Sequence, residues 1–186
     1  DLMGSVRLGN KYAFEVLIHR HQRSVLNFIF RFMGNPTDAE DLTQEVFLRV
    51  WKAAGTYKPD AKFTTLLYPI ATNLCINRQH AIRIRRLFVQ SHIQEQIQNS
   101  KDSSIIGESA GILSPEERLI DSEQSVRLLN ALNELPTSQR VAIVLRIYDE
   151  MSYQEIAQIM DRSVSSVDSL LIRAKKNLHR KLVEKK

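Results

Sequence analysis

The sequence Ser152-Tyr-Gln-Glu-Ile-Ala-Gln-Ile-Met-Asp-Arg-Ser-Val-Ser-Ser-Val-Asp168 predicts two short helices joined by the tight polar turn 161–163. Ser152-Tyr-Gln-Glu155 has the form of a capping box, in which the serine and the glutamate satisfy each other's backbone N–H groups. Ser165-Ser-Val-Asp168 repeats this spacing and is predicted to open the second helix. Two such helices, with the small Ala157 in the first, are typical of a helix-turn-helix, which lays its second helix in the major groove of DNA.

The second of these helices is predicted to have one face in the core and one face outward. Apolar residues recur at helical spacing and are expected to face the core: Val167, Leu170, Leu171, Ala174 and Leu178. The opposite face is expected to contact DNA: Ser166, Ser169, Ile172, Arg173 and Lys176. An arginine can donate two hydrogen bonds to one guanine. Asp168 either caps the helix at its third position or accepts from a cytosine amino group. The alternative is an ordinary helical hairpin with a solvated basic face.

Upstream of this motif the apolar spacing predicts more helices and no strand. Helices are expected over 12–32, about 38–54, 66–86 and 114–133, and another begins at Pro136. Thr37-Asp-Ala-Glu40 and Ser114-Pro-Glu-Glu117 have the form of further capping boxes. Residues 90–111 are rich in Gln, Ser and Asn, which is typical of a linker. The sequence thus predicts an all-α fold of two small helical domains, 1–90 and 114–186, joined by the flexible linker 91–113.

Composition and charge narrow the class of protein. The chain has 186 residues, of which 43% are hydrophobic and 25% are charged, as in ordinary folded domains. Residues 1–90, 91–125 and 126–186 carry net charges of +6, −5 and +4, so two basic lobes flank an acidic segment and indicate a polyanionic partner.

One cysteine, Cys75, is too few for a disulfide framework or a multi-cysteine metal site, and we expect it in the core. No apolar run is long enough to cross a bilayer, and the cytoplasm is the expected compartment. Because the chain opens at Asp1 without a methionine, a short leader is expected before it.

The helix 38–54 has a second face of a different character. Ala39, Leu42, Val46, Val50 and Trp51 form its expected buried stripe. Along the other face lie Asp41, Gln44, Glu45, Leu48 and Lys52. A leucine among carboxylates and an amide on a solvent face indicates a protein partner. A solvated helix with one exposed leucine explains the pattern equally well.

The stretch from Tyr57 to Asn77 combines aromatic, basic and amide side chains. Tyr57, Phe63 and Tyr68 alternate with Lys58 and Lys62, a mixture that suits stacking on unpaired bases and binding to phosphates. Asn73 and Asn77, one helical turn apart, suit hydrogen bonding to base edges. Alternatively, Phe63 and Tyr68 are core residues. Pro69 is expected either to be the first residue of the following helix or to kink it, and the first arrangement costs less.

These motifs together resemble the extracytoplasmic-function (ECF) group of bacterial sigma factors. The resemblance rests on Asp38-Ala-Glu-Asp-Leu-Thr-Gln-Glu-Val-Phe-Leu-Arg-Val-Trp51, on Leu66-Leu-Tyr-Pro-Ile-Ala-Thr-Asn73, and on Leu135-Pro136, Ser152-Tyr-Gln-Glu-Ile-Ala157, Val164-Ser-Ser-Val167 and Arg173-Ala174. It implies a transcription initiation factor that is not an enzyme and needs no cofactor or metal. The implied partners are core RNA polymerase (the clamp helices of its largest subunit and the flap of the second largest), promoter DNA and an anti-sigma factor or other regulatory protein.

The resemblance also implies three sets of binding residues. Polymerase would be bound by Asp38, Asp41, Gln44, Glu45, Leu48 and Lys52. The −10 element would be melted and held by Tyr57, Lys58, Lys62, Phe63, Tyr68, Asn73 and Asn77. The −35 element would be read by Ser165, Ser166, Asp168, Ser169, Ile172, Arg173 and Lys176. The chain departs from the family pattern at Leu66, Pro69 and Asp168, where tryptophan, arginine and a basic residue are usual.

Two other functions remain open on the residues alone. A promoter-specific activator or repressor would account for the helix-turn-helix but not for the exposed Leu48 face or the aromatic-basic stretch. A nucleic-acid enzyme would need a catalytic constellation, and the sequence shows none because its carboxylates lack a histidine or cysteine companion.

Overall fold

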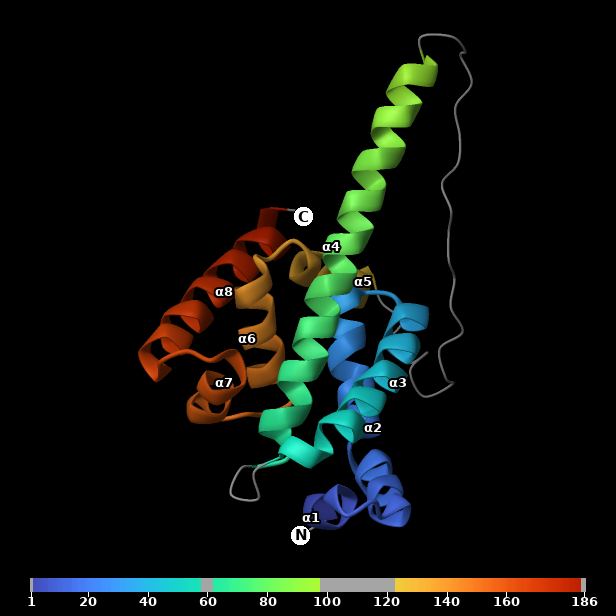
Figure 1. Ribbon diagram of the computed structural model, residues 1–186. Helices are drawn as coiled ribbons and strands as arrows, with labels where there is room; N and C mark the ends of the chain where they lie inside the picture. Colours follow the sequence, from blue (N-terminus) through green and yellow to red (C-terminus); the bar gives the residue numbers. More distant parts are fainter. Residues whose placement is uncertain (1, 58–61, 98–122, 185–186) are drawn as a thin grey trace.

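The protein is a bundle of helices (Figure 1). The computed structural model describes residues 2–57, 62–97 and 123–184, and every regular element within these ranges is helical. In chain order the elements are α1 (Leu2–Arg7), α2 (Lys11–Met33), α3 (Pro36–Ala53), the 3-10 turn η1 (Ala54–Thr56), α4 (Thr64–Ile97), α5 (Glu123–Asn133), α6 (Thr137–Ile147), α7 (Tyr153–Met160) and α8 (Val164–Glu184). The all-α prediction is confirmed.

The junction between α2 and α3 shows how local chemistry sets helix ends. Gly34 ends α2 in the left-handed conformation, with φ 71°, where a side chain would be strained. The Asn35 side chain caps α3 by accepting a hydrogen bond of 2.9 Å from the Asp38 backbone N–H. Pro36 takes the first helical position, where its missing N–H costs nothing. The predicted capping box at Thr37 is therefore wrong, because the Asn35 cap lies two residues earlier.

Helix α4 begins five residues before Pro69, so the prediction that a helix starts at this proline is wrong. Without an N–H, Pro69 cannot donate to the Thr65 carbonyl. Leu67 and Tyr68 are nevertheless buried in this turn, and we infer that burial of their side chains outweighs the lost hydrogen bond. At its other end α4 runs to Ile97, into the first seven residues of the expected linker. The rest of that linker and the motif at 114–117 lie outside the described residues.

Helices α1 to α4 form an N-terminal lobe. The α3 stripe is buried as predicted, with Trp51 partly covered and packed 5.0 Å from Phe14 between ring centroids. Cys75 is also in the core, and burial raises the pKa of its thiol to about 12. This keeps the cysteine a neutral packing residue at physiological pH.

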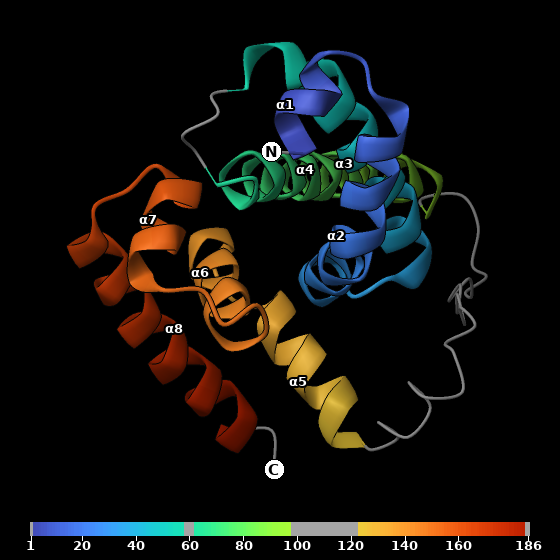
Figure 2. The same ribbon diagram turned by 90° about the horizontal axis from the view of Figure 1, so that it is seen from below.

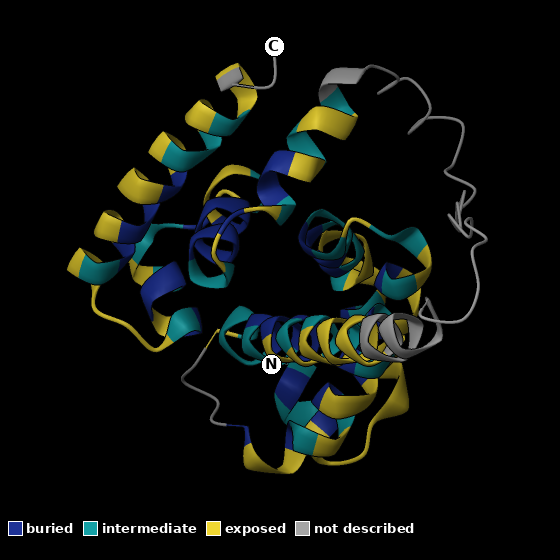
Figure 3. Cartoon of the chain, turned by 90° about the horizontal axis from the view of Figure 1, so that it is seen from above, coloured by how far each residue is buried: buried dark blue, intermediate teal, exposed yellow. Residues whose placement is uncertain are grey.

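Helices α5 to α8 form a C-terminal lobe, seen beside the first lobe in Figure 2. The central α6 is buried along most of its length, including every residue from Gln139 to Leu145. Figure 3 shows the complementary pattern on α8, where exposed positions alternate with buried ones along the helix. Helix α6 therefore anchors this lobe, and α8 supplies its outer surface.

The two lobes are in contact. Helix α2 packs against α5 and α6, and α4 packs against α7. Buried side chains of both lobes, such as Phe32, Leu67 and Ile143, belong to one continuous apolar cluster. Separate folding of each lobe, as the sequence suggests, stays a prediction.

Candidate functional site

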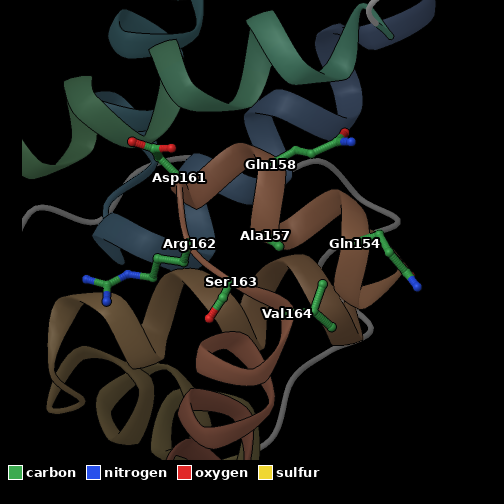
Figure 4. Close-up of a pocket in the computed structure, with 7 residues that line it drawn as sticks. All are labelled: Gln154, Ala157, Gln158, Asp161, Arg162, Ser163 and Val164. Carbon is green, nitrogen blue, oxygen red and sulfur yellow. The ribbon is translucent and has the colours of Figure 1, made fainter.

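The helix-turn-helix is formed by α7 and α8. The Ser152 N–H donates to Glu155 Oε2 at 2.9 Å and the Glu155 N–H donates to Ser152 Oγ at 3.3 Å, so the predicted capping box of α7 is confirmed. Asp161 ends α7 in the left-handed conformation, with φ 51°. Figure 4 shows the turn that follows, around an open hollow of about 610 Å³ lined by Gln154, Ala157, Gln158, Asp161, Arg162, Ser163 and Val164.

The start of α8 differs from the prediction. Ser163 Oγ accepts a hydrogen bond of 3.2 Å from the Ser166 N–H, and the helix begins at Val164. The cap therefore lies two residues before the predicted Ser165, because Ser163 is the last serine outside the helix. Asp168 falls in the second turn and is not a capping residue. Its other expected role, as a hydrogen-bond acceptor for DNA, stays a prediction.

The outer face of α8 is polar and basic with one large apolar side chain. Ile172 is 60% exposed, while Val167 and Ala174 on the inner face are fully buried. Ser166 is half-buried. The other predicted DNA-contacting residues are exposed: Ser165, Asp168, Ser169, Arg173 and Lys176. The Arg173 Nε donates to the Ser169 carbonyl at 3.1 Å, a bond that fixes the base of the guanidinium on the helix surface.

The second candidate surface is the outer face of α3. Leu48 is 56% exposed, and the predicted Asp41, Gln44 and Lys52 are exposed with it. The half-buried Glu45 pairs with Arg49 one turn further on, at 2.7 Å. Asp38 differs from the rest, because its carboxylate accepts a hydrogen bond of 2.9 Å from Arg78 of α4 and so ties α3 to α4.

The aromatic residues of the third candidate surface are largely covered. Tyr57 is buried against α1 and η1, and Phe63 is half-buried with its ring centroid 5.0 Å from that of His21. Burial, with a smaller effect of Arg20, lowers the pKa of His21. Tyr68 is only 3% exposed, which agrees with its alternative interpretation as a core residue.

The polar residues of this surface are more accessible. Lys62, Asn73 and Asn77 are exposed, while Lys58 lies outside the described residues. Lys62 nevertheless has a partner, because its Nζ lies 2.7 Å from Glu155 Oε1 of α7. The Tyr68 hydroxyl likewise donates to Asp149 Oδ1 in the turn between α6 and α7, at 2.8 Å.

None of the predicted binding residues is Arg140, the residue with the most hydrogen bonds at the junction of the lobes. This arginine is 3% exposed, and its Nη1 donates to the Phe32 carbonyl at the end of α2, at 2.8 Å. Its Nη2 donates to the carbonyls of Asn133 and Leu135. Burial lowers the Arg140 pKa to about 10, so the side chain stays charged. In the sequence, the one feature that points to a buried arginine is the position of Arg140 immediately before the apolar run 141–145.

The described residues hold no group of three His, Cys, Asp or Glu side chains that could bind a metal ion. Within the same ranges no helix is long and apolar enough to span a membrane.

Comparison with known proteins identifies both lobes. Residues 17–86 match the family described as Sigma-70 region 2, and residues 125–178 match Sigma-70, region 4. The chain is 29% identical to the RNA polymerase sigma-H factor of Pseudomonas aeruginosa, over 98% of this chain and 92% of that protein. It is 30% identical to the ECF RNA polymerase sigma-E factor of Escherichia coli K12, over 97% of this chain and 92% of that protein.

Solved structures share the fold. The structure of CnrH in complex with the cytosolic domain of CnrY superposes with a TM-score of 0.70 at 23% identity, covering 100% of this chain and 97% of that one. The sigma factor RpoE of Bartonella quintana, in complex with the anti-sigma factor NepR, gives a TM-score of 0.67 at 22% identity, covering 91% and 96%.

Two helical lobes that match regions 2 and 4 define a sigma-70-type transcription initiation factor. The chain belongs to the ECF family of bacterial RNA polymerase sigma factors. It acts as a promoter-recognising initiation factor for RNA polymerase, and its family consists of transcription factors rather than catalysts.

Proposed function

We propose that this sigma factor reads the −35 element with α8, holds the −10 element with residues 57–77, and binds core polymerase through the outer face of α3. The observation that carries the proposal is the capped helix-turn-helix, whose second helix has an exposed face ending in Arg173 and Lys176. Arg173 has the geometry to read a guanine through two donors. Lys176, one turn nearer the end, suits a backbone phosphate. The other residues of the −35 set are Ser165, Ser166, Asp168, Ser169 and Ile172.

The −10 element would meet the loop before α4 and the exposed side of that helix. Lys62 offers a phosphate partner, and Asn73 and Asn77 offer amide groups for base edges. Stacking of bases on Tyr57, Phe63 or Tyr68 requires these rings to leave their present positions. The remaining member of this set is Lys58.

Polymerase binding would centre on Leu48, the large apolar side chain that is exposed on this face. The partner surface would be the clamp helices of the largest subunit, contacted also by Asp41, Gln44, Glu45 and Lys52. Asp38 would contribute only if released from Arg78. The C-terminal lobe would dock on the flap of the second largest subunit.

A regulatory partner is also part of the proposal. The structural neighbours described above are complexes, with the cytosolic domain of CnrY and with the anti-sigma factor NepR. We expect an anti-sigma factor to bind this chain as well. Because it works with RNA polymerase, its compartment would be the cytoplasm.

Run-off transcription with core polymerase on a promoter library tests the promoter assignment. Arg173→Ala should relax the preference at one or two base pairs of the −35 element, at about 1–3 kcal/mol of discrimination. Arg180→Ala, which removes an equal charge from an exposed position on the same helix, should leave base preference unchanged. An unaltered preference in Arg173→Ala would contradict the assignment of this residue.

Binding of the full chain to core polymerase tests the α3 face. Leu48→Asp should weaken binding by about 1–3 kcal/mol, since a central apolar anchor is replaced by a charge. Leu8→Asp, a similar change at an exposed leucine between α1 and α2, serves as the control. Equal affinity of the two variants, at equal melting temperature, would show that the α3 face is solvated surface and not a binding site. Binding of the wild type to promoter DNA but not to polymerase would favour the activator or repressor instead.

A further inference from the structure

A hollow between α4 and the start of α6 lies outside the three sets of binding residues assigned above. Its volume is about 340 Å³, and six residues line it: Gln79, His80, Ile82, Arg83, Arg86 and Thr137. Thr137 is the first residue of α6, and the other five belong to α4. Each lobe therefore supplies one wall of this hollow.

The polar side chains of the hollow can all donate hydrogen bonds: Gln79, His80, Arg83, Arg86 and Thr137. No carboxylate lines the hollow, and residues 61–94 contain neither Asp nor Glu. A recess surrounded by donors, with two guanidinium groups among them and no acidic residue, has the chemistry of a site for an anion.

Arg83 and Arg86 supply the positive charge of the hollow. They lie three residues apart, on the face of α4 that also carries Gln79, and like charges at this spacing repel each other. Neither arginine has an ion-pair partner among the residues that the structure describes. An anion with two charged groups would relieve this repulsion, because the planar guanidinium forks match the oxygens of phosphate.

The start of α6 adds donors from the other wall. Pro136 precedes this helix, and no side chain caps its first turn, where the backbone N–H groups have no partner within the helix. The helix dipole places a partial positive charge at the same end. Because Thr137 lines the hollow, this end of α6 favours the same negative charge as the two arginines.

The size of the hollow limits the ligand to a small molecule. Pockets for small molecules have volumes of about 300–1,000 Å³, and the volume of about 340 Å³ lies near the lower limit. A recess of this size between two helices admits a short chain of phosphate groups, whereas a DNA duplex is too wide to enter it. Ile82 adds an apolar contact on the α4 wall.

We propose that this hollow binds a small molecule with a diphosphate or triphosphate group, whose phosphates contact Arg83, Arg86 and the start of α6. The proposal does not depend on the −10, −35 or polymerase assignments, because none of the lining residues belongs to those sets. The ligand would contact both lobes and would stabilise the folded chain in proportion to the logarithm of its concentration, once that concentration exceeds the dissociation constant.

Calorimetric titration of the full chain with pyrophosphate tests the site, at an ionic strength fixed with chloride. Arg83→Gln and Arg86→Gln should each weaken binding about tenfold or more, since each removes charge-assisted hydrogen bonds. Arg85→Gln removes the same charge from an exposed position on α4 that does not line the hollow, and it should bind like the wild type. A wild type that does not bind, or equal losses in all three variants, would overturn the proposal.

Nuclear magnetic resonance tests whether both walls take part. Pyrophosphate should shift the backbone N–H signal of Thr137 and the Nε–H signals of Arg83 and Arg86, while the Nε–H signal of Arg85 should stay in place. Shifts confined to α4 would show that the anion only associates with a basic helix, and they would contradict a site between the lobes.

Two further ligands test the class of molecule. Pyrophosphate should bind more tightly than inorganic phosphate, because only the longer anion reaches both guanidinium groups at once. Equal affinities would contradict the assignment of a diphosphate or triphosphate. A duplex of mixed sequence tests the backbone of DNA as the source of phosphate. If Arg83→Gln weakens duplex binding more than Arg85→Gln does, but leaves pyrophosphate binding unchanged, the arginine contacts DNA and the proposal has failed.

Discussion

Asp149 occupies an unfavourable position for a carboxylate. Burial raises its pKa to about 6, although the hydrogen bond from Tyr68 of α4 and the charge of Arg31 of α2 act in the opposite direction. Its Oδ2 is buried without a hydrogen-bond partner among the described residues. An unpaired carboxylate oxygen away from water costs free energy, so the folded protein favours the protonated form.

The direction of the pH effect follows from this raised pKa. Where Asp149 is exposed, as in the unfolded chain, its pKa returns to about 3.9. The contribution of Asp149 to stability is therefore greatest at acid pH and is lost as the pH rises through 6. At pH 7.5 the folded protein holds a charged carboxylate in a poorly solvated position.

Asp149→Asn should therefore stabilise the protein at pH 7.5, by about 1–2 kcal/mol. The amide keeps an oxygen that accepts from Tyr68 and removes the charge. Thermal unfolding of both proteins between pH 5 and 7.5 measures the effect, and the difference between them should grow with pH. Glu150→Gln, at an exposed position, should show no such trend. A constant difference across this range would rule out titration of Asp149 as the cause.

At the scale of single elements, α4 is the helix whose sequence and structure disagree most. It keeps Pro69 in its second turn, where the Thr65 carbonyl receives no helical hydrogen bond from that residue. The burial of Leu67 and Tyr68 on the same turn holds the chain helical. The first turns of α4 are thus maintained by packing against the rest of the protein rather than by local preference.

Pro69→Ala should stabilise the protein by about 1–2 kcal/mol, less than the full helix penalty of proline because the unfolded chain also gains freedom. The melting temperature should rise by roughly 2–6 °C. Asn73→Ala raises helix propensity in the same helix without restoring a backbone donor, and it should have the smaller effect. A melting temperature unchanged by Pro69→Ala would mean that the Thr65 carbonyl has another partner.

Helix existence was predictable from this sequence, while several helix ends were not. The apolar stripes of α3 and α8 and the inward position of Cys75 follow from helical spacing alone. The predicted helix starts are wrong where two residues compete to cap the helix: Asn35 with Thr37, and Ser163 with Ser165. The predicted start of α4 at Pro69 is also wrong, because burial of the neighbouring side chains outweighs the unfavourable effect of proline inside a helix. A local pattern carries no information about which side chains a distant segment will cover.

The same reason explains what could be predicted of the candidate site. The outward faces of α3 and α8 are local properties, and their exposure agrees with the prediction. The covering of Tyr68 and the pairing of Lys62 depend on residues more than 80 positions away. No spacing rule connects such positions, so only the folded structure reveals these contacts.

At the scale of the whole molecule, the lobes share one apolar cluster although a long segment separates them in sequence. The composition of residues 94–111 predicts that limited proteolysis cuts there first. After that cut the two fragments should still co-elute on size exclusion at low salt, because contacts such as Phe32 with Arg140 join the lobes. The fragments of Asp149→Arg should separate more readily. Fragments of the wild type that separate at once, each still helical, would show that the lobes are held together only by the chain.

The hydrogen bond from Arg140 to the Phe32 carbonyl spans 108 positions, and this spacing has a consequence during synthesis. At about 5–20 residues per second, a ribosome reaches the end of α4 at Ile97 roughly 2–9 s before Arg140 is made. During that interval Lys62 and Tyr68 have no C-terminal lobe to cover them. A nascent chain can therefore meet polymerase or DNA with this surface uncovered, and the contacts between the lobes form only once translation is nearly complete.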